Sequence, residues 1–110
     1  MAGSDLYTGS LDLIILRALR GGPLHGYAIG RWIRQTTEDL LVIQEGALYP
    51  ALHRLEHRGY LDESWGTSET GREVKFYRLT PAGRKQLKEE TARWRAYARV
   101  MNVALASGKP

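Results

Sequence analysis

His53 and His57 lie four residues apart with Glu56 between them, in the order H-x-x-E-H. On a helix this spacing brings both imidazoles to one face, and inverted zinc proteases use the same pattern to bind zinc. A five-residue pattern arises often by chance, however, and no obvious third ligand follows with a supporting pocket. The sequence also lacks a P-loop, a Rossmann glycine pattern and a nucleophile elbow. We therefore predict that the chain is not an enzyme and holds no metal or cofactor.

The other residues whose side chains could carry a function are basic, and they are concentrated in the C-terminal half. The chain of 110 residues carries 16 Lys and Arg against 12 Asp and Glu, which gives a net charge of +4. Between Arg72 and Arg99, nine basic residues stand against three acidic ones. Such a stretch favours a polyanion partner such as nucleic acid, although a solvated helix face has the same composition.

Length and composition indicate a single globular domain from a reducing compartment. A chain of 110 residues has room for one core, and 43% hydrophobic with 25% charged residues is ordinary for a folded protein. With no cysteine there are no disulfides. The first ten residues lack a secretory pattern, and no apolar run approaches the roughly 20 residues of a membrane span. We predict a cytoplasmic protein with no membrane partner.

Apolar spacing predicts two helices in the first third of the chain. The first begins near Thr8 or Ser10, either of which can cap it, and ends at Gly21 and Gly22. It is apolar almost all round, so we expect it to be buried on two sides. The second helix runs from about Gly26 to Thr36 and has one apolar face.

A third helix and a hairpin follow. The helix begins near Gly46 or Ala47, because Pro50 deeper in a helix removes a hydrogen bond and clashes with the preceding turn. Aromatic and branched residues over Leu61–Trp65 and Glu73–Leu79 predict two strands, and the segment between them has turn chemistry.

A long helix closes the chain. Thr80 and Pro81 supply its N-cap and its first residue, and it can run to about Leu105. Three helices followed by a hairpin are the order of a winged helix-turn-helix protein. We predict a mainly α fold with a winged helix-turn-helix domain (three helices plus a β-hairpin wing) over residues 1–80, a C-terminal dimerisation helix over residues 81–106 and a disordered tail over residues 107–110.

The long helix carries an apolar stripe at spacings of four and three residues, the heptad pattern of paired helices. Together with the very apolar first helix, this stripe makes a two-fold homodimer the simplest closed assembly. Folding of the long helix onto its own domain is the alternative, since a stripe does not distinguish the two. The residues predicted at the dimer interface are Leu11, Ile15, Leu87, Thr91, Trp94, Ala98, Met101 and Leu105.

Three segments of the chain resemble the PadR family of transcriptional regulators: LHGYAIGRWI, GALYPALHRLEHRGYL and GREVKFYRLTPAGRKQL. Several separate motifs occur in the right order over about residues 6 to 90. The resemblance implies a dimeric winged-helix repressor of the compact subgroup, with a single C-terminal helix. The residues that carry it are His25, Gly26, Tyr27, Leu48, Tyr49, Pro50, Leu55, Glu56, Gly59, Tyr77, Leu79, Thr80 and Gly83.

The predicted DNA contacts come from three elements. The third helix should enter the major groove by its N-terminal end, the second helix should hold the backbone, and the wing should reach phosphates or the adjacent minor groove. Tyr49 could instead brace the second helix, and Arg54 could pair with solvent or with neighbours of Glu56. The predicted contact residues are Tyr27, Arg31, Ala47, Tyr49, Pro50, His53, Arg54, Arg72 and Lys75.

These features predict a sequence-specific, dimeric DNA-binding protein, and the resemblance implies a transcriptional repressor that a small ligand releases. Some compact PadR-like regulators stack flat aromatic compounds on a tryptophan of the last helix. The resemblance therefore implies a planar aromatic effector at Trp94 and Tyr97, with plain interface packing as the alternative. A dimeric interaction module that does not bind DNA is the alternative function.

Overall fold

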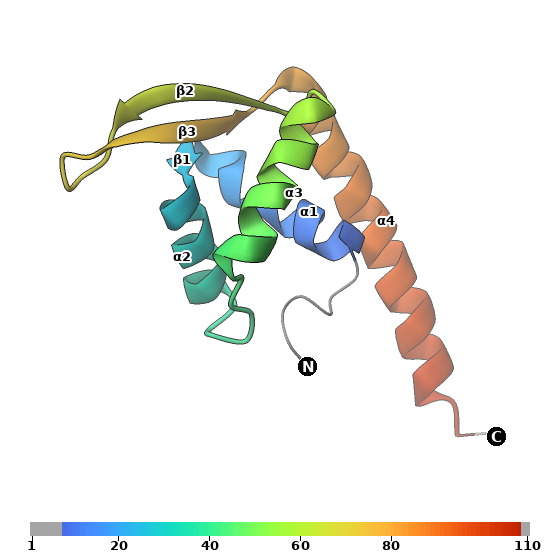
Figure 1. The fold of residues 1–110 in the computed structure, drawn as a ribbon. Helices are drawn as coiled ribbons and strands as arrows, with labels where there is room; N and C mark the ends of the chain where they lie inside the picture. Colours follow the sequence, from blue (N-terminus) through green and yellow to red (C-terminus); the bar gives the residue numbers. More distant parts are fainter. Residues whose placement is uncertain (1–7, 109–110) are drawn as a thin grey trace.

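The computed structural model describes residues 8–108 and confirms the predicted fold class. Helices and strands follow the order of a winged helix fold that ends in one long helix (Figure 1). The predicted tail begins directly after that helix ends, and residues 1–7 and 109–110 lie outside the described part. The elements are α1 (Thr8–Ala18), the 3-10 turn η2 (Leu19–Gly21), β1 (Leu24–His25), α2 (Gly26–Thr36), α3 (Glu45–His57), β2 (Leu61–Thr67), β3 (Glu73–Leu79) and α4 (Pro81–Ala106).

The wing is a twisted hairpin that extends from the helical body (Figure 1). Strands β2 and β3 pair antiparallel from Leu61 opposite Leu79 to Thr67 opposite Glu73, so β2 is two residues longer than predicted. A third strand was not predicted: β1 pairs antiparallel with β3 through Leu24 and joins the hairpin to α2. Two residues are too few for an alternating pattern, so β1 depends on the tertiary pairing.

Helix α3 begins one residue earlier than predicted. Gln44 is its N-cap and Glu45 its first residue, which makes Pro50 the sixth residue of the helix. Pro50 therefore leaves the Gly46 carbonyl without its helical N–H donor. Gly46 is exposed, so solvent can supply the missing donor, and the helix continues to His57.

Helix α1 lies at the centre of the fold, with α2, α3 and α4 packed around it. Ile15 is 0% exposed in the single chain, so the prediction that it lies at a dimer interface is wrong. Leu11 is only partly buried and keeps surface for a partner. The fold thus packs α1 against three helices of its own chain and leaves its N-terminal half partly exposed. Other large core side chains come from α1, η2, α2, α3 and the two strands of the wing: Leu16, Leu19, Ile29, Ile33, Leu48, Leu52, Leu55, Leu61, Tyr77 and Leu79.

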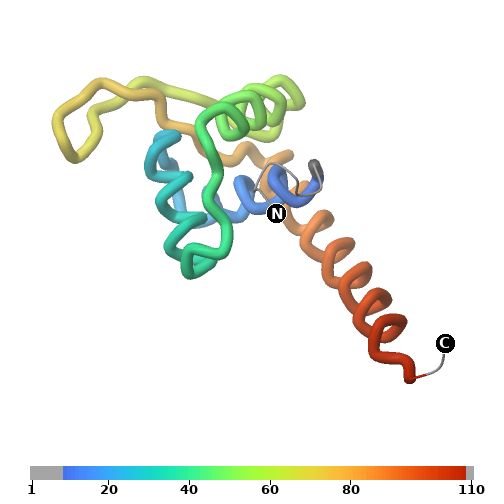
Figure 2. Tube along the Cα trace, turned by 60° about the horizontal axis from the view of Figure 1, so that its bottom comes forward, coloured from blue at the N-terminus to red at the C-terminus, as the bar shows by residue number. Residues whose placement is uncertain are grey.

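Helix α4 starts as predicted and then leaves the body of the molecule. The Thr80 hydroxyl accepts a hydrogen bond from the Gly83 N–H at 3.0 Å, and Pro81 is the first helical residue. Leu87 is 8% exposed and belongs to the chain's own core, so its predicted place at a dimer interface is also wrong. As far as Tyr97 the helix still lies beside α1, and its last turns extend away from the other elements (Figure 2). No helix among residues 8–108 has the length and apolar character that crossing a membrane requires.

Candidate nucleic-acid interface

The N-terminal turn of α2 presents an aromatic ring and a cation at the surface. His25 caps the helix, since its Nδ1 accepts a hydrogen bond from the Ala28 N–H at 3.2 Å. Tyr27 is 69% exposed, and the Arg31 guanidinium lies 5.5 Å from the centre of its ring. A cation over an aromatic face is held in place by the ring, so the two side chains are oriented together at the surface.

Arg31 and His25 also approach the tip of the wing. Glu69 Oε1 lies 3.4 Å from His25 Nε2 and 3.7 Å from Arg31 Nη2. The pKa of the Glu69 carboxyl is held below its usual range, first by its own backbone N–H and then by the His25 hydrogen bond. The carboxylate is largely exposed, so these contacts orient the wing tip toward α2 rather than stabilise the fold strongly.

Tyr49 joins α3 to α2. A Cβ atom placed on Gly26 would lie 2.5 Å from the Tyr49 hydroxyl oxygen, so the tyrosine ring crosses directly over the first residue of α2. Glycine at position 26 makes this crossing possible. Tyr49 nevertheless stays 38% exposed. Tyr49 therefore packs between the two helices and keeps part of its ring accessible to a ligand. The two interpretations of Tyr49, packing against α2 and contact with DNA, are compatible.

The remaining predicted residues of α3 lie along its outer side. Pro50 and His53 are exposed, and Ala47 is partly buried. His53 Nδ1 lies 3.9 Å from Glu56 Oε1, a long contact that leaves most of the ring accessible. Pro50 and His53 are therefore accessible on the outer side of α3, as contact with base edges requires.

The wing contributes two predicted cations and one aromatic residue that the sequence analysis missed. Arg72 is exposed at the turn before β3. Lys75 Nζ lies 3.3 Å from Glu63 Oε1 and 5.6 Å from the centre of the Trp65 ring. Trp65 is 63% exposed on β2, directly opposite Lys75 in the strand pairing. The signal was present in the sequence, because a tryptophan in a short hairpin of a small domain has little core to enter.

A cleft of about 360 Å³ brings these elements together. Four of the predicted DNA-binding residues line it: Tyr27, Tyr49, Arg72 and Lys75. Trp65 and Glu45 line it as well, and neither was predicted. Arg31 lies in the adjoining recess between α2 and α3, whereas Ala47, Pro50, His53 and Arg54 line neither hollow. The cleft is therefore the point at which α2, α3 and the wing converge on one surface.

Arg54 has a different place from the one predicted. Its Nη2 lies 2.5 Å from Asp12 Oδ1, and Asp12 is only 13% exposed at the side chain. Arg58 Nη1 approaches the second oxygen of the same carboxylate at 3.7 Å. The hydrogen bond to Asp12 raises the pKa of the Arg54 guanidinium further above neutrality. Arg54 thus fixes α3 against α1, and we leave it out of the DNA interface proposed below.

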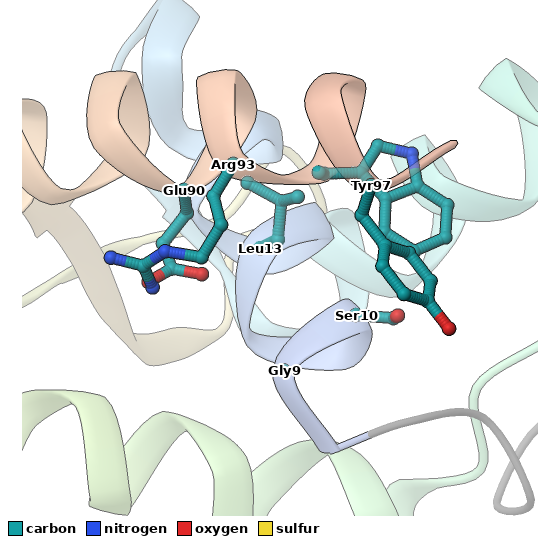
Figure 3. Close-up of a pocket in the computed structure, with 7 residues that line it drawn as sticks. Gly9, Ser10, Leu13, Glu90, Arg93 and Tyr97 are labelled. Carbon is teal, nitrogen blue, oxygen red and sulfur yellow. The ribbon is translucent and has the colours of Figure 1, made fainter. Parts of the chain in front are cut away.

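A second hollow lies between α1 and α4, on the far end of the molecule from the wing. It has a volume of about 260 Å³ and is predominantly apolar. Gly9, Ser10 and Leu13 line it from α1 (Figure 3). From α4 come Trp94 and Tyr97, whose ring centres are 6.0 Å apart, and the ion pair between Glu90 and Arg93 (Figure 3). The two predicted effector residues therefore line one hollow.

Comparison with known proteins places the chain in a family. Residues 15–89 match the family model described as the transcriptional regulator PadR-like family. The chain belongs to this family. A transcriptional regulator from Mycobacterium tuberculosis is 38% identical over 87 residues, which cover 78% of this chain and 77% of that protein.

Solved structures of transcriptional regulators share the fold over most of the chain. A transcriptional regulator from Clostridium thermocellum is 40% identical with a TM-score of 0.77, covering 86% of this chain and 88% of that one. A PadR family transcription regulator from Clostridium difficile R20291 is 30% identical with a TM-score of 0.76, covering 87% and 98%. The resemblance drawn from the sequence motifs is thereby confirmed.

Membership in the PadR-like family also decides the question of catalysis. The family consists of transcriptional regulators and not of enzymes, which confirms that prediction. The H-x-x-E-H residues His53, Glu56 and His57 lie on α3, the helix that the fold exposes beside the wing. Among residues 8–108, no group of three or more His, Asp or Glu side chains is placed to hold a metal ion.

Proposed function

We propose that this PadR-like regulator binds double-stranded DNA in a sequence-specific manner, as a homodimer. The observation that supports the proposal most directly is the cleft in which α2, α3 and the wing meet. Its cations and aromatic rings come from three elements, as contact with both backbone and base edges requires. We further propose that the regulator is a repressor that a small ligand releases.

Within this interface each element has a separate task. The N-terminal half of α3 enters the major groove, where His53 and Tyr49 reach base edges and the small Ala47 and Pro50 allow close approach. Arg72 contacts phosphate, because it is exposed and has no carboxylate within ion-pair distance among residues 8–108. Lys75 and Trp65 extend this contact along the wing.

Tyr27 and Arg31 of α2 hold the DNA backbone in the proposed complex. Glu45 lines the same cleft as the cations. A carboxylate repels phosphate, so we place Glu45 against a base edge, where cytosine offers an amino donor. The residue then adds specificity rather than affinity.

Two substitutions separate the phosphate contacts from the base contacts. We expect Arg72→Ala to weaken binding to operator and random duplex by the same factor and to lower the salt dependence by about one contact per subunit. His53→Ala should instead weaken operator binding by about tenfold and leave random duplex unchanged, because a base contact is worth roughly 1–3 kcal/mol. Gel shifts at several salt concentrations, on an operator selected from random duplexes, measure both.

The same experiment tests the alternative function. If the protein fails to shift any duplex at low salt, it is a dimeric interaction module without DNA binding, and the proposed interface is wrong. Equal losses on both duplexes for His53→Ala would remove that residue from base recognition. An unchanged salt slope for Arg72→Ala would remove Arg72 from the phosphate contacts.

Dimerisation is proposed for α4, residues 81–106, with residues 1–80 as the DNA-binding domain. The outer half of α4 keeps apolar side chains of the stripe exposed, among them Trp94, Met101 and Leu105. A second copy of the same helix covers them with two-fold symmetry. Ile15 and Leu87 are buried within the single chain and are left out of the proposed interface. The interface then consists of Leu11, Thr91, Trp94, Ala98, Met101 and Leu105.

A planar aromatic effector is proposed for the hollow that Trp94 and Tyr97 line. Both rings are nearly half exposed in the single chain, and two-fold pairing brings a second Trp94 to the same place. A ligand stacked there can release DNA only if it prefers one spacing of the two recognition helices over the other.

Fluorescence titration with a planar aromatic dye tests the effector site. We expect saturable quenching in the native protein and its loss in Trp94→Ala, while a Trp65→Phe variant keeps it. Trp32 and Trp65 contribute emission of their own, so the variants are needed to assign the signal. Quenching that persists in Trp94→Ala would show that the dye binds elsewhere.

A further inference from the structure

A third hollow, between the end of α1 and the first half of α4, gathers cations that the proposed DNA interface does not use. Its volume is about 550 Å³, and five basic side chains line it: Arg17, Arg20, Arg84, Lys88 and Arg95. The lining contains no acidic residue. It shares no residue with the cleft between α2, α3 and the wing. We call this hollow the basic cavity.

The cations of the basic cavity lack the carboxylate partners that most basic residues elsewhere in residues 8–108 have. Within residues 8–108, Arg20, Arg84, Lys88 and Arg95 take part in no ion pair. The Arg17 guanidinium lies 5.3 Å from the centre of the Trp32 ring and is thereby fixed in position. By contrast, a carboxylate lies within ion-pair distance of Arg31, Arg34, Arg58, Lys75, Arg78 and Arg93.

Like charges around one concave surface raise the local potential and concentrate anions there. The five cations converge on a single cavity, whose size falls in the range of small-molecule sites. Because the cations surround one cavity rather than follow a line, they favour a compact ligand with several negative charges over an extended polymer. Leu79 and Leu87 also line the cavity and are largely buried, so the ligand meets apolar surface beneath the charges.

The proposed dimer leaves the basic cavity accessible. Arg84, Lys88 and Arg95 lie on one face of α4, since their spacings are four and seven residues. That face is turned about a quarter turn from the apolar stripe that includes Trp94 and Met101. Pairing of two α4 helices through the stripe therefore leaves the cationic face open. Of the residues that line the cavity, only Thr91 belongs to the proposed dimer interface as well.

We propose that the basic cavity is a binding site for a compact organic polyanion, a ligand with two or more phosphate groups on an apolar or aromatic body. The phosphates contact Arg84, Lys88 and Arg20, and the body lies over Leu79 and Leu87. Nucleoside polyphosphates have this chemistry. The site is independent of the proposed DNA function, because no residue is common to the two.

Isothermal titration of the full-length protein with ATP and with inorganic pyrophosphate tests the proposal. We expect saturable binding of one ATP per chain and about tenfold weaker binding of pyrophosphate, which has the charges but not the body. Arg84→Gln should weaken ATP binding about tenfold through loss of one charge-assisted contact. Arg99→Gln is the matched control: it removes the same charge from the same helix outside the cavity, and binding should stay within twofold.

Three results would overturn the proposal. They are absence of saturable ATP binding, equal binding of pyrophosphate and ATP, and an Arg84→Gln variant that binds ATP like the native protein. Circular dichroism checks that each variant is folded, and Lys88→Gln replaces Arg84→Gln if the latter is not. Operator binding is measured separately by gel shift, so failure of the polyanion site and failure of the DNA interface give different results.

Discussion

Met101→Glu is expected to convert the protein to a monomer and to lower its operator affinity by about a hundredfold or more. Met101 lies on the apolar stripe of α4 and is 37% exposed in the single chain. In the proposed dimer two copies of the glutamate would face each other across an apolar contact, and desolvation of unpaired charges is costly. A monomer engages one half-site instead of two, so the gain from simultaneous binding is lost.

Val103→Glu is the matched control for this prediction. Val103 is two residues away on the same helix and 68% exposed, on the side of α4 away from the stripe. The substitution is equally polar, yet the dimer and its operator affinity should persist. Sedimentation equilibrium at micromolar concentration and gel shifts measure the two effects. A Met101→Glu variant that still sediments as a dimer would show that α4 pairs through another face or does not pair at all.

Gly83→Ala is expected to lower the free energy of unfolding by about 3 kcal/mol and the melting temperature by about 10 °C or more. In most helix interiors this substitution is stabilising by up to about 1 kcal/mol. At position 83 a Cβ atom would lie 2.1 Å from the backbone oxygen of Tyr60. That oxygen accepts a hydrogen bond from the Thr80 N–H at 3.1 Å, so it cannot move away without disturbing the start of α4.

Gly46→Ala supplies the comparison. Gly46 lies in the first turn of α3, and no atom comes within 4 Å of a Cβ placed there. This variant should be as stable as the native protein or slightly more stable. Thermal and urea unfolding followed by circular dichroism give both values. If Gly83→Ala were as stable as Gly46→Ala, the close contact between α4 and the Tyr60 carbonyl would not exist in solution.

Local signals in the sequence determined most of the elements. The bounds of α2 and the start of α4 at Thr80 and Pro81 were predicted, because capping and proline geometry act within a few residues. The aromatic and branched residues of the hairpin and the turn residues between its strands predicted the wing in the same way. The convergence of Tyr27, Tyr49, Arg72 and Lys75 followed from the element order of a winged helix-turn-helix.

What only the tertiary structure decided were the contacts between residues distant in the chain. Asp12 meets Arg54 across 42 residues, and β1 exists only because β3 lies beside it. Arg17 of α1 lines the basic cavity together with Arg84 and Lys88 of α4. The spacing of apolar residues indicates which face of a helix is apolar, but it does not indicate which element covers that face. Ile15 was predicted at a dimer interface, yet packing inside the chain buries it, because the sequence pattern is identical for a core and an interface.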